Sequence, residues 1–225
     1  MARTKEAQYE DCLRAAEESG VDNLGIMTNQ VWRDDPRRLA ILLSRYKFVG
    51  KMLSGKRRVA EVGCGDAFGS RVVQQEISEL TVLDIDPVFI ADIEQRMHAD
   101  WPLSAATHDM LGGPYPGIFD AAYSLDVLEH IPADQEQSFI RNIVSSLNND
   151  GVLIIGMPSL ESQAYASPQS KAGHINCKHG PDLKALMARF FDNVFLFSMN
   201  DEVVHTGFSP MAHYHLALCC GKRRV

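Results

Sequence analysis

The sequence predicts an α/β fold built on a doubly wound, mainly parallel sheet. Two observations carry this prediction: short apolar runs of strand length alternate with amphipathic segments of helix length, and a glycine-rich turn follows the first run. Such an alternation forms right-handed β-α-β units, whose parallel sheet is covered on both faces by helices. The chain has 225 residues, 45% of them hydrophobic. That is enough to bury the core of one generous domain with a small appendage.

The first 55 residues are predicted to form a helical cap, and residues 56–225 the main domain. An amphipathic segment covers residues 5–19. A second one, "DDPRRLAILLSRYKFVGKML", begins with Asp35 as a helix cap and Pro36 at the first helical position. Neither segment has the period of a strand, so both are assigned to the cap.

The main domain contains seven segments that are expected to be strands. They are 57–62, 80–86, a run ending at "HDM" (108–110), 119–125, 151–157, "NVFLFSM" and "AHYHLALCC". A loop joins the last two, so they are expected to add to the sheet edge in antiparallel orientation. Residues 158–180 are polar and without periodicity. A loop of this length in a compact domain is usually functional, and it is expected to border the site where a substrate binds.

Composition narrows the classes of partner. The formal net charge of −7 disfavours nucleic acid as a partner, because an acidic chain repels phosphate backbones. Five cysteines without a CxxC pair suggest reduced thiols rather than disulfides or a zinc site. The sequence shows neither an apolar signal region nor a run of membrane-spanning length. A soluble cytoplasmic protein with a small-molecule partner is expected; its oligomeric state is left open, with a dimer as one alternative.

The first predicted strand runs into a glycine loop, "EVGCGDAFGS". Gly63 and Gly65 would let the backbone approach a ligand closely, and the following helix offers free N–H groups. The next glycine, Gly69, comes one residue late for the G-x-G-x-x-G dinucleotide fingerprint. The carboxylate of Glu61, two residues before the loop, suits an ammonium group better than a pyrophosphate.

Two further carboxylates follow at strand ends. Asp84 ends the second strand, where a carboxylate can accept from both hydroxyls of a ribose. Asp109, in "HDM", ends the third strand and could meet an adenine amino group. An amino-acid group, a ribose and an adenine together describe S-adenosylmethionine.

The segments "VAEVGCG", "VLDID", "HDM", "FDAAYSLDVLEHI" and "LNNDGVLIIGMPS" resemble, in order and spacing, the motifs of class I S-adenosylmethionine-dependent methyltransferases. The resemblance covers about residues 56–160, and within the class it is similar to small-molecule enzymes such as the ubiquinone-pathway O-methyltransferases. It implies a Rossmann-like, seven-stranded sheet with a reversed last strand.

The resemblance also implies roles for individual residues. Arg38 matches an arginine that helps to hold the carboxylate of the cofactor, although Asp35 replaces the family's asparagine; a surface arginine is the alternative. The expected cofactor-binding residues are Arg38, Glu61, Gly63, Gly65, Asp84, Ile85, Asp109, Met110 and Leu125.

The segment "YSLDVLEHIP" contains the candidate catalytic groups. Asp126, Glu129 and His130 stand at i, i+3 and i+4, so a helical turn would place them on one face. Two carboxylates and an imidazole suit Mg²⁺, Mn²⁺ or Fe²⁺ better than structural zinc, and some relatives carry a metal site of this spacing. Glu129 and His130 could instead line the pocket or handle a proton without a metal. His174, in the 158–180 loop, is either an acceptor-side base or an exposed loop histidine.

The predicted function is methyl transfer from S-adenosylmethionine to a hydroxyl of a small molecule, such as a sugar or a quinone-like precursor. Alternatives are an N- or RNA 2′-O-methyltransferase, and a catalytically inactive cofactor-binding module that acts through partners. An NAD-dependent oxidoreductase is disfavoured by the late third glycine.

Overall fold

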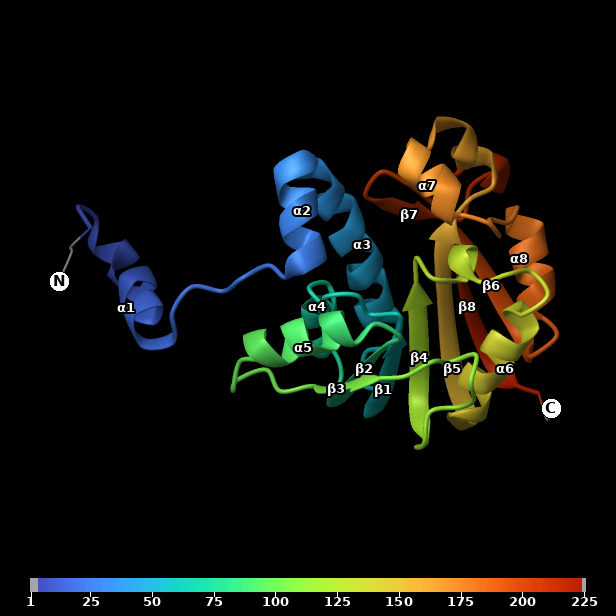
Figure 1. Ribbon diagram of the computed structural model, residues 1–225, viewed down its shortest axis with the longest axis horizontal. Coiled ribbons are helices and arrows are strands. Elements are labelled where there is room, and N and C mark those ends of the chain that lie inside the picture. The colour runs from blue at the N-terminus through green and yellow to red at the C-terminus, as the bar shows by residue number, and fades with distance from the viewer. Residues whose placement is uncertain (1–3, 224–225) are drawn as a thin grey trace.

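A computed structural model describes residues 4–223, whose strands form one eight-stranded sheet in the order β3-β2-β1-β4-β5-β8-β6-β7 (Figure 1). The strands are β1 (Arg58–Val62), β2 (Glu79–Asp84), β3 (Ser104–Thr107), β4 (Phe119–Leu125), β5 (Leu147–Pro158), β6 (Phe191–Asn200), β7 (Val203–His205) and β8 (Tyr214–Lys222). Strands β1 to β5 pair in parallel. The pairs β5–β8, β8–β6 and β6–β7 are antiparallel. The predicted mixed sheet with reversed strands at one edge is confirmed.

The sheet has one strand more than the seven expected. The extra strand, β7, has three residues and pairs with the end of β6, where Ser198 lies opposite His205. The chain turns back after β6 at Asp201, whose φ is +48°. This tight turn closes a short hairpin before the chain crosses to β8.

Helices cover both faces of the sheet. The structure contains α1 (Glu10–Ser19), α2 (Ile26–Asp34), α3 (Arg37–Met52), α4 (Ser70–Gln74), α5 (Pro87–Arg96), α6 (Glu136–Ser145), α7 (Pro168–Gly173) and α8 (Gly180–Met187). Short 3₁₀ turns are η1 (Ala7–Tyr9), η2 (Leu128–His130), η3 (Glu161–Tyr165) and η4 (Ser209–Met211). Helices α3, α4 and α5 pack on one face, and α6 and α8 on the other.

Each face has its own apolar core, and β1 contributes to both. Val59 packs with Val49 of α3, whereas Ala60 and Val62 pack with side chains of α6 and α8 such as Phe139. This alternation follows from the two-residue period of a strand. Because both faces are covered, the central strands read as nearly continuous apolar runs.

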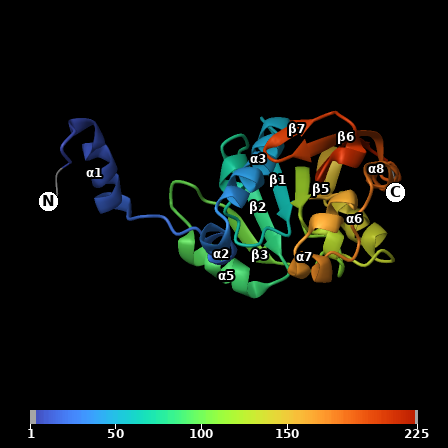
Figure 2. The ribbon, with the colours of Figure 1, turned by 90° about the horizontal axis from the view of Figure 1, so that it is seen from above.

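The N-terminal helices begin close to the predicted positions. The expected helix at 5–19 is divided into η1 and α1. Helix α3 starts directly after Pro36, which is its N-cap; Asp35 does not cap the helix as expected, and its carboxylate instead accepts from Arg37. Helix α1 stands apart from the sheet in both views (Figures 1 and 2), and no residue of this helix is buried against the rest of the described chain.

The polar segment 158–180 contains η3 and α7, which Ser167 caps by accepting from the Ser170 N–H. No helix within residues 4–223 is both long and apolar enough to cross a membrane.

Candidate active site

A cavity of about 560 Å³ opens at the carboxyl ends of β1, β4 and β5. Its wall combines the glycine loop, the turn after β4, the inner sides of α2 and α3, and the segment that contains η3 and α7. The carboxyl edge of a parallel sheet is where ligands bind in doubly wound folds. Eight of the residues expected in the site line this cavity: Arg38, Gly63, Gly65, Leu125, Asp126, Glu129, His130 and His174.

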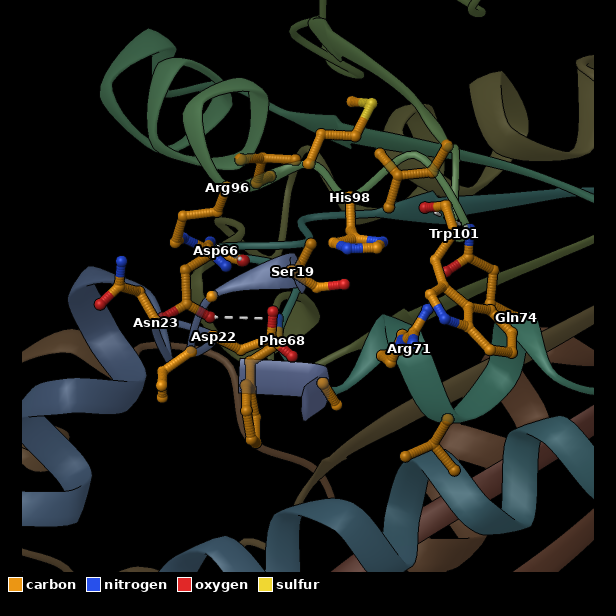
Figure 3. A pocket seen from close by; sticks show the side chains of 18 of the residues that line it. Ser19, Asp22, Asn23, Asp66, Phe68, Arg71, Gln74, Arg96, His98 and Trp101 are labelled. Atoms are coloured by element: carbon orange, nitrogen blue, oxygen red, sulfur yellow. Dashed lines mark hydrogen bonds between the residues drawn. The ribbon is translucent and has the colours of Figure 1, made fainter. Parts of the chain in front are cut away.

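A second cavity, of about 670 Å³, lies between α1, α4 and α5 (Figure 3). In it the Arg71 guanidinium carbon lies 3.5 Å from the centre of the Trp101 ring. Asp66 and Phe68 line both cavities. Among the described residues, the second cavity contains none of the side chains that the sequence assigned to the site.

The glycine loop takes a backbone conformation that depends on its glycines. Gly63 and Gly65 have φ of +77° and +53°. A Cβ on Gly63 would lie 2.2 Å from Cγ2 of Val127. The Asp84 carboxylate supports the loop: its Oδ2 accepts from the Gly65 N–H at 2.8 Å and its Oδ1 from the Asp86 N–H at 2.9 Å. Each oxygen has a second lone pair, which a ribose hydroxyl could use.

Three of the expected cofactor-binding residues, Ile85, Asp109 and Met110, lie outside the lining of the cavity. Ile85 is 66% exposed directly after β2, as an apolar face on which a ring could pack. Asp109 accepts from the Leu111 N–H at 2.9 Å, and Met110 is buried in the core. The structure therefore places Met110 beneath the surface rather than in contact with a ligand.

Glu61 is also placed differently from the expectation. Its side chain is buried and accepts hydrogen bonds from Tyr46 (2.9 Å), Tyr123 (2.7 Å) and the Ser70 hydroxyl. Burial raises the pKa of Glu61 to about 7, against the lowering effect of these three donors. The carboxylate joins α3, α4 and β4 beneath the glycine loop and does not line the cavity.

The turn after β4 separates the three polar residues that a helix would have kept together. Asp126 has φ of +58°, and only Leu128–His130 form a single 3₁₀ turn. The Asp126 carboxylate accepts from Arg45 Nη1 through both oxygens, at 2.9 and 2.7 Å. The expected set of Asp126, Glu129 and His130 is therefore not the group that the structure assembles.

The group that the structure does assemble is Glu129, His130 and His174. One potential ligand atom from each lies within 4.8 Å of the others. Glu129 is fully buried, and neither of its carboxyl oxygens has a hydrogen-bond partner among the described residues. Burial, reinforced by the charge of Asp126, raises the pKa of Glu129 to about 9. An unpartnered buried carboxyl is costly, so this group is suited to a proton or a cation.

Both imidazoles are fixed through Nδ1. His130 Nδ1 lies 2.9 Å from the Gly173 carbonyl oxygen, and His174 Nδ1 lies 2.9 Å from Oε1 of Gln163. The two rings meet edge to face with their centres 5.2 Å apart. Burial lowers the pKa of His174, as does the neighbouring His130, so its neutral form is favoured.

Backbone contacts hold the segment after α7 against η2. The Ile175 and Asn176 N–H groups both donate to the Glu129 carbonyl, at 2.9 and 3.0 Å. The Asn176 amide and the Lys178 ammonium both contact Oε2 of Glu136 at the start of α6. These contacts explain how a histidine 44 residues along the chain reaches His130.

Arg45 and Tyr214 are site residues that sequence reasoning missed. The Arg45 guanidinium lies 3.7 Å from the centre of the Tyr214 ring, and both residues line the cavity. One signal was present: Arg45 follows Arg38 by seven residues, so the two share a face of α3. Tyr214, on the last strand, gave no such signal.

Comparison with known proteins agrees with this geometry. Residues 60–153 match the family model described as a methyltransferase domain. The chain carries a class I S-adenosylmethionine-dependent methyltransferase domain. The N-methyltransferase NodS from Bradyrhizobium japonicum, in complex with S-adenosylhomocysteine, superposes with a TM-score of 0.64 and 17% identity, covering 96% of this chain and 99% of NodS. The methyltransferase domain of bacterial CtHen1 superposes with a TM-score of 0.66 and 12% identity, covering 80% of this chain and 98% of that domain.

Curated relatives of this methyltransferase domain are distant. A ubiquinone biosynthesis O-methyltransferase from Xanthomonas campestris is 24% identical over 161 residues, which are 65% of this chain and 63% of that protein. The chain thus spans less than two thirds of the length of that relative. The structural neighbours establish the fold, and the sequence relatives establish a distant similarity to ubiquinone-pathway enzymes.

Proposed function

We propose that this chain transfers a methyl group from S-adenosylmethionine to a hydroxyl oxygen of a small molecule, with Glu129, His130 and His174 as the acceptor-side centre. The observation that carries the proposal is the buried, unpartnered Glu129 carboxyl facing two histidines in the cavity of the cofactor loop. The family and the S-adenosylhomocysteine complex of NodS support the cofactor.

Positioning is the main contribution of the protein. The cofactor carries the reactive methyl on a sulfonium, so the domain has to align donor and acceptor. Such alignment is worth roughly 7–11 kcal/mol of the barrier. In this proposal Gly63 and Gly65 let the methionine part approach the backbone, and Asp84, which supports the loop through the Gly65 N–H, accepts from the ribose. A cofactor held in this way would lie at the edge of the cavity that contains Glu129.

The acceptor-side centre fits a divalent transition-metal cation such as Mn²⁺ better than Mg²⁺, which prefers oxygen ligands. It offers one carboxylate and two imidazoles, and the contacts at Nδ1 leave Nε2 of both rings available. Neutral imidazole held through its other nitrogen is the usual form of a metal-binding histidine. A bound cation would lower the pKa of an acceptor hydroxyl and polarise it. Burial and the charge of Asp126 raise the pKa of Glu129, and a bound cation would offset both effects.

The centre also contains a base, His174, that can accept the proton which the acceptor hydroxyl loses. His174 is favoured as a neutral base by the burial that lowers its pKa, and it lines the cavity. A positioned base contributes typically about 10²–10⁴-fold to the rate of such a step. An amine acceptor that is already neutral needs no such base. The centre therefore favours oxygen over nitrogen as the methylated atom. The net charge of −7 favours a small molecule over RNA.

Calorimetry tests cofactor and centre separately. S-adenosylhomocysteine should bind at micromolar concentration, whereas NAD should not. Asp84→Asn should weaken the binding of S-adenosylhomocysteine at least tenfold, since a hydrogen bond to a charged group is worth about 1.5–3 kcal/mol. Asp86→Asn is the matched control, because asparagine also caps α5. Mn²⁺ should bind to the wild type and not to Glu129→Gln. Binding of Mn²⁺ that is indifferent to this substitution would contradict the proposed centre.

A further inference from the structure

The side chain of Gln163, in η3, links the end of β5 to His174. We propose that Gln163 is a positioning residue, which fixes the tautomer and ring orientation of His174 so that Nε2 faces Glu129 and His130. The inference rests on the proposed function only in taking these three residues as the acceptor-side centre. Gln163 itself touches His174, and it lines the same cavity.

The orientation of the Gln163 amide follows from its other contacts. Its Nε2 donates to the Ser159 carbonyl at 3.2 Å and to the Ser162 hydroxyl at 3.3 Å. A carbonyl oxygen accepts and never donates, so the amino group has to face Ser159. If the amide were reversed, Oε1 of Gln163 would face the Ser159 carbonyl oxygen, and no hydrogen bond could form between them. The oxygen of Gln163 is thereby directed to His174.

Ser159 gives this amide a rigid support. It is fully buried directly after β5, and its hydroxyl donates to the Ala212 carbonyl at 2.6 Å. The same hydroxyl accepts from the Ser162 N–H at 3.0 Å, while the Ser162 hydroxyl donates to the Ser159 carbonyl at 2.8 Å. A chain of hydrogen bonds therefore runs from the sheet, through Ser159 and Gln163, to His174.

This chain determines which nitrogen of His174 carries the proton. Gln163 Oε1 lies 2.9 Å from His174 Nδ1 and only accepts, so Nδ1 is the N–H and Nε2 keeps its lone pair. His130 is held in the same form, because its Nδ1 faces the Gly173 carbonyl. Both rings thus keep an unprotonated Nε2, which is what a cation or an acceptor proton needs.

The role is separable from holding the loop in place. The segment after α7 remains attached to η2 through the Ile175 and Asn176 N–H groups, and to α6 through Lys178. Removing the amide of Gln163 should therefore leave the fold and cofactor site intact while releasing the His174 ring. The variant of choice is Gln163→Leu, which removes the amide and keeps an apolar side chain. Lys171→Met is the control, because Lys171 lies in the same segment and, among residues 4–223, its side chain donates only to the Ala164 carbonyl.

The test is ¹⁵N NMR of the histidine rings in the metal-free protein above the pKa of His174, with the signals assigned through His174→Gln and His130→Gln. Wild type and Lys171→Met should show His174 as the Nδ1–H tautomer. Gln163→Leu should show a mixture or the Nε2–H tautomer. An Nε2–H form in the wild type, or an unchanged tautomer in Gln163→Leu, would overturn the inference.

Metal and cofactor binding supply a second readout. Gln163→Leu should weaken Mn²⁺ binding about 10–100-fold, as loss of a group that orients a ligand typically does. S-adenosylhomocysteine affinity should stay within about twofold, which a variant with a disrupted fold would not maintain. If the wild type bound no Mn²⁺, the cation part of the proposed function would fail, while the tautomer comparison would still decide the role of Gln163.

Discussion

The buried carboxyl of Glu129 should make the stability of the metal-free protein depend on pH in a way that Glu129→Gln abolishes. Its pKa is raised to about 9 by burial, whereas an unfolded glutamate titrates near its ordinary value of about 4.3. Between these values the folded state holds a proton that the unfolded state has lost. The contribution of Glu129 to the free energy of unfolding is therefore largest below the unfolded pKa, and it decreases as pH rises toward the folded pKa.

The expected slope is the free energy of one proton, about 1.4 kcal/mol per pH unit. The difference in unfolding free energy, wild type minus Glu129→Gln, should therefore become less favourable by about 1.4 kcal/mol from pH 7 to pH 8. Glu61, whose pKa is raised to about 7, titrates equally in both proteins and cancels in the comparison.

Urea unfolding at pH 7.0, 7.5 and 8.0 in the presence of a chelator measures this difference. Glu94→Gln, at an exposed position on α5, is the control and should follow the wild type. Saturating Mn²⁺ should remove the slope from the wild type, since a bound cation keeps the carboxylate charged. Equal slopes in wild type and Glu129→Gln would refute the assignment of Glu129 as a carboxyl without a compensating charge.

Two further substitutions test the glycine loop and the turn after β4. Gly63→Ala should cost about 1–3 kcal/mol more unfolding free energy than Gly55→Ala in urea titrations. Both glycines have positive φ, but only a Cβ at 63 meets Val127, at 2.2 Å; equal costs would contradict the close approach. Arg45→Met should cost about 2–3 kcal/mol, because it strands a half-buried carboxylate and removes a stacked guanidinium. Arg37→Met, at an exposed ion pair, should leave stability nearly unchanged. A similar loss of stability in Arg37→Met and Arg45→Met would show that the Arg45–Asp126 pair contributes no more than an exposed one.

Much of the fold could be predicted because its signals are local. The period change from helix to strand and the glycine loop each depend on a few adjacent residues. The structure bears this out: β1 to β5 pair in parallel, and Gly63 and Gly65 both have positive φ. The short hairpin of β7 was missed because β7 has only three residues, too few to show the alternating pattern of a strand. Aspartate is enriched at positive φ, as at Asp201, but a single aspartate does not identify a turn.

The site was predicted less completely, because its contacts join distant segments. Glu61 lies next to the glycine loop in sequence, yet hydroxyls from α3, α4 and β4 enclose it. Asp126 matches the spacing of a metal ligand, but Arg45, 81 residues earlier, binds its carboxylate. Gln163 carries no motif, and its place beside His174 depends on how the segment after β5 folds back. The spacing of residues in the sequence identifies candidate functional side chains, whereas the fold determines which of them lie close together.

The most direct test of the proposed function is the rate of S-adenosylhomocysteine formation with paired acceptors, such as catechol and its diamine counterpart, compared between wild type and Glu129→Gln. The account predicts turnover of the hydroxyl acceptor by the wild type, loss of that turnover on chelation, recovery with Mn²⁺, and a large defect in Glu129→Gln. Turnover of the amine in preference to the hydroxyl, at a rate unaffected by chelator and by Glu129→Gln, would contradict it.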